Sequence, residues 1–456
     1  MSIMHSRGYQ MIETKILTPT GMMGYGFPIE DFKSGLELKP DVIVVDSGSI
    51  DSGPYKLGSG ATTCPVSAYE VELNILVSAS VDHNIPLMIS SAGGAGTNDQ
   101  VDLFYEIVHR ILGEKGSTVK VAKIYSEIKK SVVDKALTDG DVTPCGNYIP
   151  DLTTADVDRC ENIVAQMGHE PFIDALNKGA GIIIAGRAYD PAPLAAFCIW
   201  KGHDAGLAWH MGKIMECGGL CATPSCQSIF GVIRNDHFDL VPLNENSKCT
   251  ETSVAAHTLY EKSHPYLLPG PGGTADLSKC IFKSIDEKVV RVSGSQFIPA
   301  PMTVKLEGAS NVGFRSITIA GVRDKNVINA LAEIEIMCNM YILQNFPLLK
   351  DKFKIKFHQY GRNAVLEEKE FSVIEPHEIC VIVEVLADDQ NTANQICSKA
   401  RIALLHAPYT GRKATSGNVA FIFSPLEIPL GGTYEFNIYH IMHNVFSSDL
   451  FQVEVV

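Results

Sequence analysis

The stretch Asp41-Val-Ile-Val-Val-Asp46, which runs into a loop with four glycines between Ser47 and Gly60, decides the fold. The apolar run reads as a buried strand, and the loop follows where that strand ends. Three other segments repeat the pattern: Lys15–Thr18 before Pro19–Gly26, Ile85–Ser91 before Ala92–Asp99, and Gly181–Ala185 before Gly186–Pro193. In an open α/β sheet the carboxyl ends of parallel strands line one edge, where ligands bind. We therefore predict that these four loops assemble a ligand site.

Helical patterns alternate with these strands. They cover Pro28–Leu38, Ser67–Asp82, Asp99–Gly113, Lys129–Leu137, Ala155–Met167, Glu170–Lys178 and Ala192–Gly202, and a further strand covers Lys120–Ile124. Alternation of helices with continuously apolar strands is typical of a mostly parallel sheet covered on both faces. The fold class is therefore α/β. The predicted N-terminal domain, residues 1–224, is a doubly wound sheet with glycine-rich loops at the carboxyl ends of its strands.

The second half of the chain has a different pattern. Its strands have polar neighbours, and two long helices are predicted over Lys325–Phe346 and Thr392–Leu405. Two βα units with intervening strands predict an α+β domain over residues 225–456, with 225–263 as the connecting segment. The ferredoxin-like arrangement is one such fold. The even spread of apolar residues in this domain favours a homo-oligomer.

Composition limits the function classes. The 456 residues carry a formal charge of −14, which disfavours a nucleic-acid partner, because binding phosphates requires clustered Lys and Arg. No apolar run approaches the ~18 residues of a membrane span, and the first residues lack the apolar core of a signal peptide. The 12 cysteines are scattered, as is usual in reduced compartments. We expect a cytoplasmic protein without a membrane partner.

The loops supply the candidate binding residues. Backbone N–H groups of glycine-rich loops and helix N-termini bind anions, so the predicted substrate-binding set in the first half is Ser47, Gly48, Ser49, Asp51, Gly53, Gly93, Gly94, Gly96, Thr97 and Asn98. The alternative is that the glycines only form turns, while Thr97, Asn98 and the aspartates cap helices.

Arg187 is the predicted anchor for a carboxylate, because its guanidinium offers a bidentate fork at a strand end. The alternative is that Arg187 pairs with Asp190 or Asp46 and braces the loops. Asp190 is itself either a binding residue or a helix cap. In the second half, Arg412 and Lys413 form a basic turn that either binds an anionic substrate or is simply solvated.

Six residues are candidates for catalysis. His210, Lys213 and Glu216 are spaced three apart on one face of a helix, and such groups transfer protons at neutral pH once desolvated. A surface ion pair beside a half-buried histidine is the alternative. His257 is a second acid–base candidate, or else a satisfied core histidine. His210 or Lys213 is predicted to move the proton, and Asp46 or Asp99 is predicted to orient it.

No certain cofactor is predicted. Mg²⁺ held by Asp46, Asp51 and Asp99 is one option, whereas Cys217, Cys221 and Cys226 fit no common zinc spacing, even with His210. The chain lacks a Gly-x-Gly-x-x-Gly fingerprint, a Walker A motif and a Gly-x-Ser-x-Gly elbow. These absences leave proton-transfer chemistry as the leading class.

Several long motifs resemble the acyclic terpene utilisation (AtuA-like) family. They are Asp46–Gly60, Gly94–Asn98, Gly186–Pro193, Ala208–Gly218, His257–Glu261, Leu268–Gly273 and Ser416–Phe421. The resemblance covers nearly the whole chain. It implies a cytosolic catabolic protein that acts on a carboxylate or its CoA thioester, and it supplies no reaction, cofactor or catalytic set.

The sequence thus favours an enzyme of carboxylic-acid or acyl-thioester catabolism. Its reaction would be hydration or dehydration, isomerisation, or C–C bond cleavage by a lyase, on a branched or unsaturated carboxylate. The alternative is a non-catalytic subunit that binds the same ligands within a larger complex, together with a small partner protein.

Overall fold

The computed structural model describes residues 12–48, 53–260, 263–371, 375–416 and 418–456. Two compact units divide the chain: unit 1 comprises Met1–Ser310 with Phe436–Val456, and unit 2 comprises Asn311–Glu435. The domain boundary expected after residue 224 lies inside unit 1, because β9 (Ile229–Ile233) and β10 (His237–Pro242) extend the main sheet.

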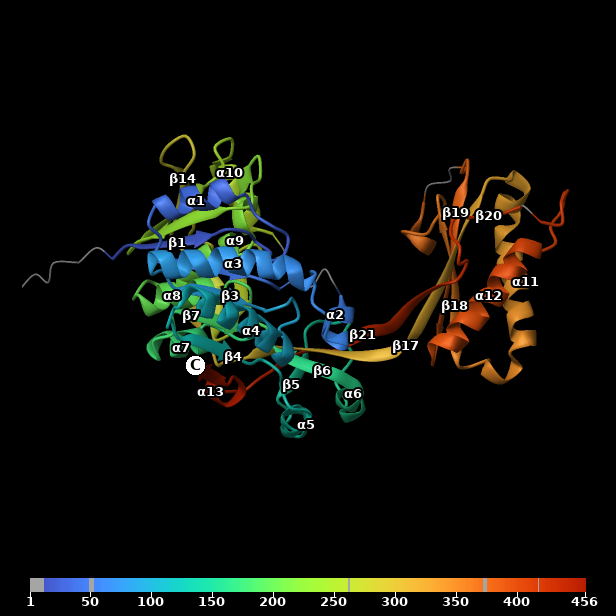
Figure 1. The fold of residues 1–456 in the computed structure, drawn as a ribbon, viewed down its shortest axis with the longest axis horizontal. Helices are drawn as coiled ribbons and strands as arrows, with labels where there is room; N and C mark the ends of the chain where they lie inside the picture. The colour runs from blue at the N-terminus through green and yellow to red at the C-terminus, as the bar shows by residue number, and fades with distance from the viewer. Residues whose placement is uncertain (1–11, 49–52, 261–262, 372–374, 417) are drawn as a thin grey trace, which may run out of the picture. The chain divides into compact units, whose positions relative to one another are not determined.

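The main sheet of unit 1 confirms the predicted α/β class (Figure 1). Its centre is five parallel strands in the order β1 (Thr14–Thr18), β2 (Val42–Asp46), β3 (Leu87–Ser90), β7 (Ile182–Ala185) and β4 (Val121–Ile124). Antiparallel strands complete both sides: β9, β10, β15 (Val290–Ser293) and β14 (Ile281–Ser284) beyond β1, and β22 (Val453–Val455) beyond β4.

Alternate residues of the parallel strands bury against helices on opposite faces, as a doubly wound sheet requires. Ile43 and Val45 of β2 belong to one apolar core, and Val42 and Val44 belong to the other. The first core is completed by α1 (Ile29–Glu37), α3 (Val66–His83) and α4 (Asn98–Lys115), and the second by α7 (Glu170–Asn177), α8 (Ala192–Trp200), α9 (Ala205–Met215) and α10 (Glu251–Thr258).

Smaller elements of unit 1 surround this sheet. They are α2 (Pro54–Ser59), α5 (Lys130–Asp139), β5 (Val142–Pro144), α6 (Thr154–Arg159), β8 (Ala222–Thr223), β11 (Lys248–Cys249) and α13 (Ser447–Leu450). A separate three-stranded sheet contains β12 (Leu267–Gly270), β13 (Gly273–Asp276) and β16 (Gln296–Pro299).

The helix predicted over Ala155–Met167 is wrong beyond Arg159. Residues Cys160–Ala165 form β6, which pairs with the first part of β17 (Val304–Val322). The buried side chains of Ile163 and Val164 fit a strand in a packed sheet. The helix is therefore limited to α6, Thr154–Arg159, and pairing with β17 makes the residues after it a strand.

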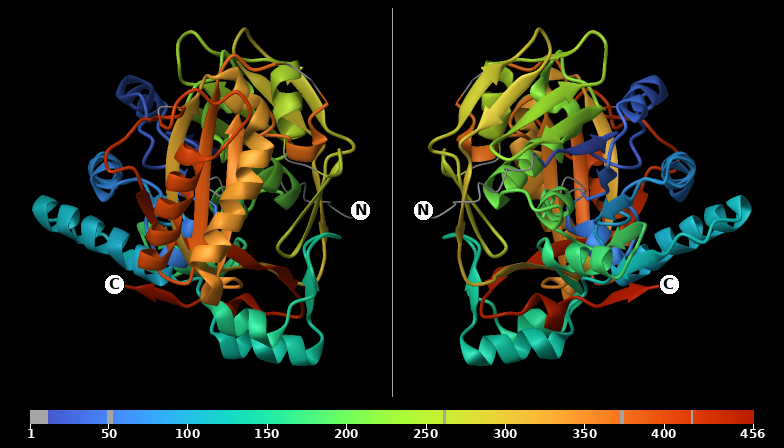
Figure 2. Two further views of the ribbon diagram at one scale, coloured as in Figure 1. Left: turned by 90° about the vertical axis from the view of Figure 1, so that its right-hand side faces the viewer. Right: turned by 90° about the vertical axis from the view of Figure 1, so that its left-hand side faces the viewer.

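Unit 2 has the predicted ferredoxin-like arrangement. Its chain order is the later part of β17, α11 (Lys325–Asn345), β18 (Phe353–Tyr360), β19 (Ile379–Ala387), α12 (Gln390–His406), and β20 (Ala420–Phe421) with the start of β21 (Ile428–Met442). The spatial order β18-β19-β17-β21 is that of a βαββαβ fold. Figure 2 (left) shows α11 and α12, in orange and red, with the strands of this unit. One apolar core joins both helices to the sheet.

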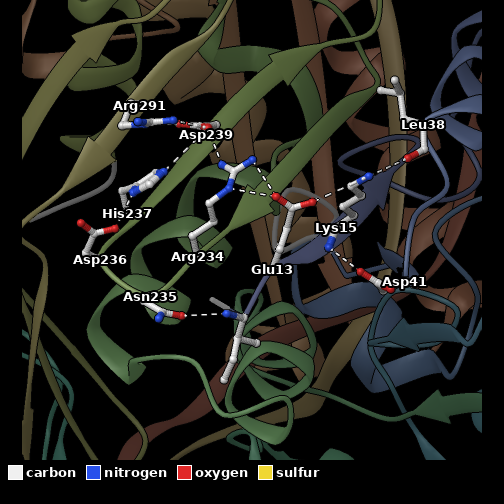
Figure 3. Close-up of polar contacts among 11 residues, drawn as sticks. Glu13, Lys15, Leu38, Asp41, Arg234, Asn235, Asp236, His237, Asp239 and Arg291 are labelled. Atoms are coloured by element: carbon white, nitrogen blue, oxygen red, sulfur yellow. Dashed lines mark hydrogen bonds and ion pairs between the residues drawn. The ribbon is translucent and has the colours of Figure 1, made fainter. Parts of the chain in front are cut away.

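A network of ion pairs lies at the amino end of β1, the edge of the sheet opposite the carboxyl ends of the parallel strands (Figure 3). Arg234, just after β9, binds both Glu13 and Asp239, at 2.8 and 2.7 Å. Arg291 of β15 also binds Asp239. The network therefore links four adjacent strands of the sheet, β1, β9, β10 and β15.

No helix in the described part of the chain is both long enough and apolar enough to cross a membrane.

Candidate functional site

A cavity of about 1000 Å³ opens in unit 1 at the carboxyl ends of the parallel strands. This volume lies at the upper end of the range for small-molecule sites. Its charged lining residues are Asp46, Arg187, Asp190, Lys213, Glu216 and Lys305. Apolar side chains complete the wall, among them Met22, Leu220, Leu267, Leu268 and Ile441. The mixture suits a ligand with an acidic head and a hydrocarbon chain.

Arg187, two residues beyond β7, is buried with 4% of its surface exposed. Its Nε donates to Glu307 Oε2 at 2.9 Å, and its Nη1 donates to Asp190 Oδ1 at 3.2 Å and to Ser91 Oγ at 3.4 Å. Within the described residues no hydrogen bond engages Nη2. Burial would lower the pKa of Arg187, but the charges of Glu307 and Asp190 outweigh burial and raise it. The guanidinium thus stays charged, with one nitrogen left for a ligand at the cavity.

Glu307 of β17 lies beneath Arg187 and is buried. Its second oxygen, Oε1, accepts from Lys305 Nζ at 2.9 Å and from Gln166 Nε2 at 3.0 Å. Burial opposes ionisation, yet Arg187 and Lys305 lower the pKa of Glu307 to about 2. The carboxylate therefore remains ionised and ties two cavity cations together.

Lys213 near the end of α9 and Glu216 just after it form a buried ion pair on the cavity wall. Burial raises the pKa of Glu216 well above its usual value, and Asp190 and Asp46 add to the rise while Lys213 opposes it. Burial would lower the pKa of Lys213, but Glu216, Tyr189 and Asp190 raise it. The arrangement is a carboxyl group with high proton affinity beside a fixed ammonium.

Asp46, the last residue of β2, also has a raised pKa. Burial and the nearby charge of Asp190 raise its pKa to about 7, although Ser90 and Arg187 act in the opposite direction. Ser90 Oγ donates to Asp46 Oδ1 at 2.6 Å, and the N–H of Gly48 donates to Oδ2 at 3.1 Å. Asp46 therefore changes charge in the neutral range.

The glycine loops act mainly as packing surfaces around Arg187. A Cβ on Gly96 would lie 2.2 Å from the Arg187 nitrogen, and one on Gly48 would lie 2.8 Å from Arg187 Nη1. Ser126, two residues after β4, joins these loops because its Oγ accepts from the Arg187 N–H and donates to Gly96 O, at 2.7 and 2.8 Å. Close approach of backbone to backbone, which only glycine allows here, thus fixes the anchor.

The structure brings Asp46, Gly48, Arg187, Asp190, Lys213 and Glu216 together at the cavity. The other predicted loop residues that the structure describes are not among the lining residues of the cavity. The Gln100 side chain accepts the N–H groups of Gly96 and Thr97, and Asn98 N–H donates to Glu127 at 2.7 Å. Asp99 lies in the first turn of α4, Ser47 N–H donates to Ser90 O, and Gly53 caps α2. Gly93 and Gly94 form the turn before α4, where Gly94 packs on Thr63. Ser49 and Asp51 are outside the described residues.

The two histidine candidates lie away from the cavity lining. His210 is fully buried on α9, where Ser295 Oγ and Thr258 Oγ1 lie 2.7 and 3.1 Å from its ring nitrogens. Its ring packs edge-on against Phe238 and Phe282. His257 stacks on Tyr260, a cavity residue, with ring centroids 5.6 Å apart. His210 is thus a fully buried, hydrogen-bonded core histidine and not the half-buried one of the alternative.

Arg412 and Lys413 belong to unit 2. The Arg412 guanidinium donates to the carbonyl oxygens of Ala414, His406 and Thr415, at 2.6–2.9 Å. Arg412 therefore braces its own turn and the end of α12.

No group of three or more His, Cys, Asp or Glu side chains among the described residues is arranged to hold a metal ion. Cys221 Sγ lies 3.9 Å from Cys249 Sγ, and Cys217 and Cys226 line the cavity. The Mg²⁺ option included Asp51, which is outside the described residues.

Four residues in or beside the cavity were not predicted from the sequence: Glu307, Lys305, Gln166 and Tyr189. The first two carried a signal: charged residues two apart in an otherwise apolar strand lie on one face of it. Tyr189 directly follows the Gly-Arg-Ala turn and lines the cavity. Burial and the charge of Glu216 raise its pKa, so the phenol stays neutral.

Comparison with known proteins gives a single relationship. Neither the curated proteins nor the solved structures contain a match to the chain. The sequence model of the family described as "Acyclic terpene utilisation family protein AtuA" matches residues 40–238 and 240–422. This match covers most of both units, including every motif that carried the resemblance from Asp46 to Phe421. The chain therefore belongs to the acyclic terpene utilisation family.

Proposed function

We propose that this protein is an enzyme of acyclic terpene utilisation that binds a branched or unsaturated carboxylate and transfers a proton next to its carbonyl group. The reaction class is hydration or dehydration, isomerisation, or C–C bond cleavage. The observation that carries the proposal is the convergence on one cavity of a carboxylate anchor, Arg187, and a buried proton-transfer pair, Lys213 and Glu216.

Each group has a defined task in this proposal. Arg187 binds the ligand carboxylate through Nη2, the guanidinium nitrogen that no hydrogen bond engages among the described residues. Glu216 is the general base, because a carboxylate with a raised pKa accepts a carbon-bound proton more readily near neutral pH. The Lys213 ammonium stabilises the enolate oxygen that develops as the proton leaves. Asp46, protonated up to about pH 7, returns a proton to the product.

The hydrocarbon part of the ligand lies on the apolar wall. Leu267 and Leu268 line the cavity from β12, and Leu220 lines it from the 3₁₀ turn after α9. Burial of methyl-branched chain on this wall contributes roughly 0.8 kcal/mol per CH₂ group. This contribution favours branched terpenoid acids over small polar acids.

Deuterium exchange tests the proposal directly. Citronellate, geranate and their CoA thioesters are incubated with the protein in D₂O, and NMR follows loss of the proton next to the carbonyl. We expect enzyme-dependent exchange that Glu216→Gln reduces by ~10²-fold or more. The matched control is Asp174→Asn, which removes the acid of the exposed Lys178–Asp174 pair and should leave exchange unchanged.

Two results would count against the proposal. If exchange continues at the wild-type rate in Glu216→Gln, then Glu216 is not the general base. Binding of the acids without any exchange would identify a carboxylate-binding subunit in place of an enzyme.

A further inference from the structure

Glu307 joins two cations that both line the cavity. Arg187 binds one of its carboxylate oxygens at 2.9 Å, and Lys305 binds the other at 2.9 Å. The two oxygens of one carboxylate are ~2.2 Å apart, so the two cations are held as near neighbours. Lys305 and Glu307 are two residues apart on β17, so both side chains lie on the same face of the strand.

The ammonium of Lys305 is fixed from a second direction. Its Nζ lies 3.8 Å from the centroid of the Tyr439 ring, a contact that orients a cation strongly. The lysine is half-buried, so it keeps one face toward the cavity. An ammonium has three donors, of which Glu307 takes one and the Tyr439 side chain engages a second.

A purely structural role does not account for this geometry. Desolvating ion pairs is costly, and apolar replacements of equal size often stabilise a protein. Here one buried carboxylate, with the Gln166 amide beside it, serves two cations at the cavity wall. Such an arrangement resembles a preorganised anion site, in which the cations are held at a fixed spacing before the ligand arrives.

We infer that Lys305 is a second anchor for the ligand carboxylate and that Glu307 is the positioning residue that sets Lys305 and Arg187 at the spacing of its two oxygens. The inference rests on the proposed function and narrows it: the ligand presents an ionised carboxylate to both cations. A primary amide or a thioester carbonyl lacks the second anionic oxygen and gains less from Lys305.

Calorimetry with citronellate and citronellamide tests the inference, because the two ligands differ only in the charged group. We expect Lys305→Met to weaken citronellate binding by ~10–100-fold, the loss of one charge-assisted hydrogen bond. Citronellamide affinity should change by less than ~3-fold. The control is Lys123→Met, which removes a lysine from an ion pair with Asp102 and Glu454 outside the cavity lining.

Glu307→Asp isolates positioning from charge, because the carboxylate is retained and only its reach is shortened. We expect a ~10-fold loss for citronellate and little loss for the amide, with far-ultraviolet circular dichroism unchanged. Equal losses for both ligands, or no loss in either variant, would overturn the inference.

Arg187→Met separates the two proposals. If Arg187→Met abolishes citronellate binding while Lys305→Met does not weaken it, the proposed function stands and the second anchor fails. If citronellate binding survives in Arg187→Met, or wild-type protein does not bind it, the proposed function fails as well.

Discussion

Asp46 is a carboxyl group that the fold keeps protonated up to neutral pH. Its pKa is raised from 3.8 to about 7, chiefly by burial. Between these two values the folded chain holds a proton that the unfolded chain has released. The stabilisation from this group is therefore fully present below pH ~4 and is lost as the pH rises through about 7.

We predict that Asp46→Asn flattens this dependence. As the pH rises from 4 to 7, the wild type loses stability from this group and the variant does not. The free energy of unfolding of the variant minus that of the wild type should therefore increase by up to about 4 kcal/mol, the equivalent of a shift of roughly three pKa units. Urea denaturation at several pH values measures the difference. Asp82→Asn, on the exposed side of α3, should give a curve parallel to that of the wild type. A parallel curve for Asp46→Asn as well would show that Asp46 does not retain the proton.

Gly96 is the residue at which backbone packing fixes the anchor. Its φ is +69°, and an added Cβ would meet the backbone of Arg187 at 2.2 Å. We predict that Gly96→Ala lowers the free energy of unfolding by about 2–5 kcal/mol, from strain and overpacking together. Gly113→Ala is the matched control at an exposed position of α4, where a Cβ meets nothing within 4 Å. It should stabilise by about 0.5–1 kcal/mol. Chemical denaturation of the two variants decides the sign in each case.

At the scale of elements, the β9–β10 hairpin is secured by Asp239, whose carboxylate binds Arg234 and Arg291 (Figure 3). Burial opposes ionisation, but the two arginines lower the pKa of Asp239 below its usual value. Its contribution to stability is therefore present above pH ~4 and is lost as the pH falls through the folded pKa.

We predict that Asp239→Asn costs about 1–3 kcal/mol near neutral pH, because two partly buried arginines lose their partner. The deficit relative to the wild type should shrink in acid. Asp236→Asn is the control in the same hairpin, since the Asp236 side chain is 86% exposed. Thermal unfolding at neutral and acidic pH measures both variants, and a deficit that stays constant with pH would contradict the assignment.

At the scale of the whole molecule, the apolar core of unit 2 is separate from the cores of unit 1, and all of the lining residues described for the cavity belong to unit 1. We predict that Ile396→Ala, which truncates a fully buried side chain on α12 of unit 2, destabilises unit 2 by about 2–5 kcal/mol. Citronellate affinity at low temperature should be unchanged. Calorimetric unfolding together with binding titration tests this, and a loss of affinity would show that the site depends on unit 2.

The sequence could predict the architecture because the apolar patterns of strands and of helices are each set by residues close together in the chain. The continuous apolar runs at Val42–Asp46 and Ile182–Ala185 identify buried parallel strands, and the βα units of the second half identify the ferredoxin-like arrangement. The segment Cys160–Ala165 could not be predicted in this way, because its strand exists only by pairing with β17, more than 100 residues later in the chain.

By itself, the sequence determined that polar loops would meet at the carboxyl edge of a sheet, and with them Asp46, Arg187 and Asp190. The three-residue spacing of Lys213 and Glu216 also predicted that the two side chains lie together on one helix face. Only the tertiary structure decided that His210 is a core residue and that one carboxylate, Glu307, pairs with both Arg187 and Lys305. The physical reason is that burial and charge pairing across distant segments are properties of the packed molecule: the same histidine or glutamate is inert or functional according to which side chains the fold places beside it.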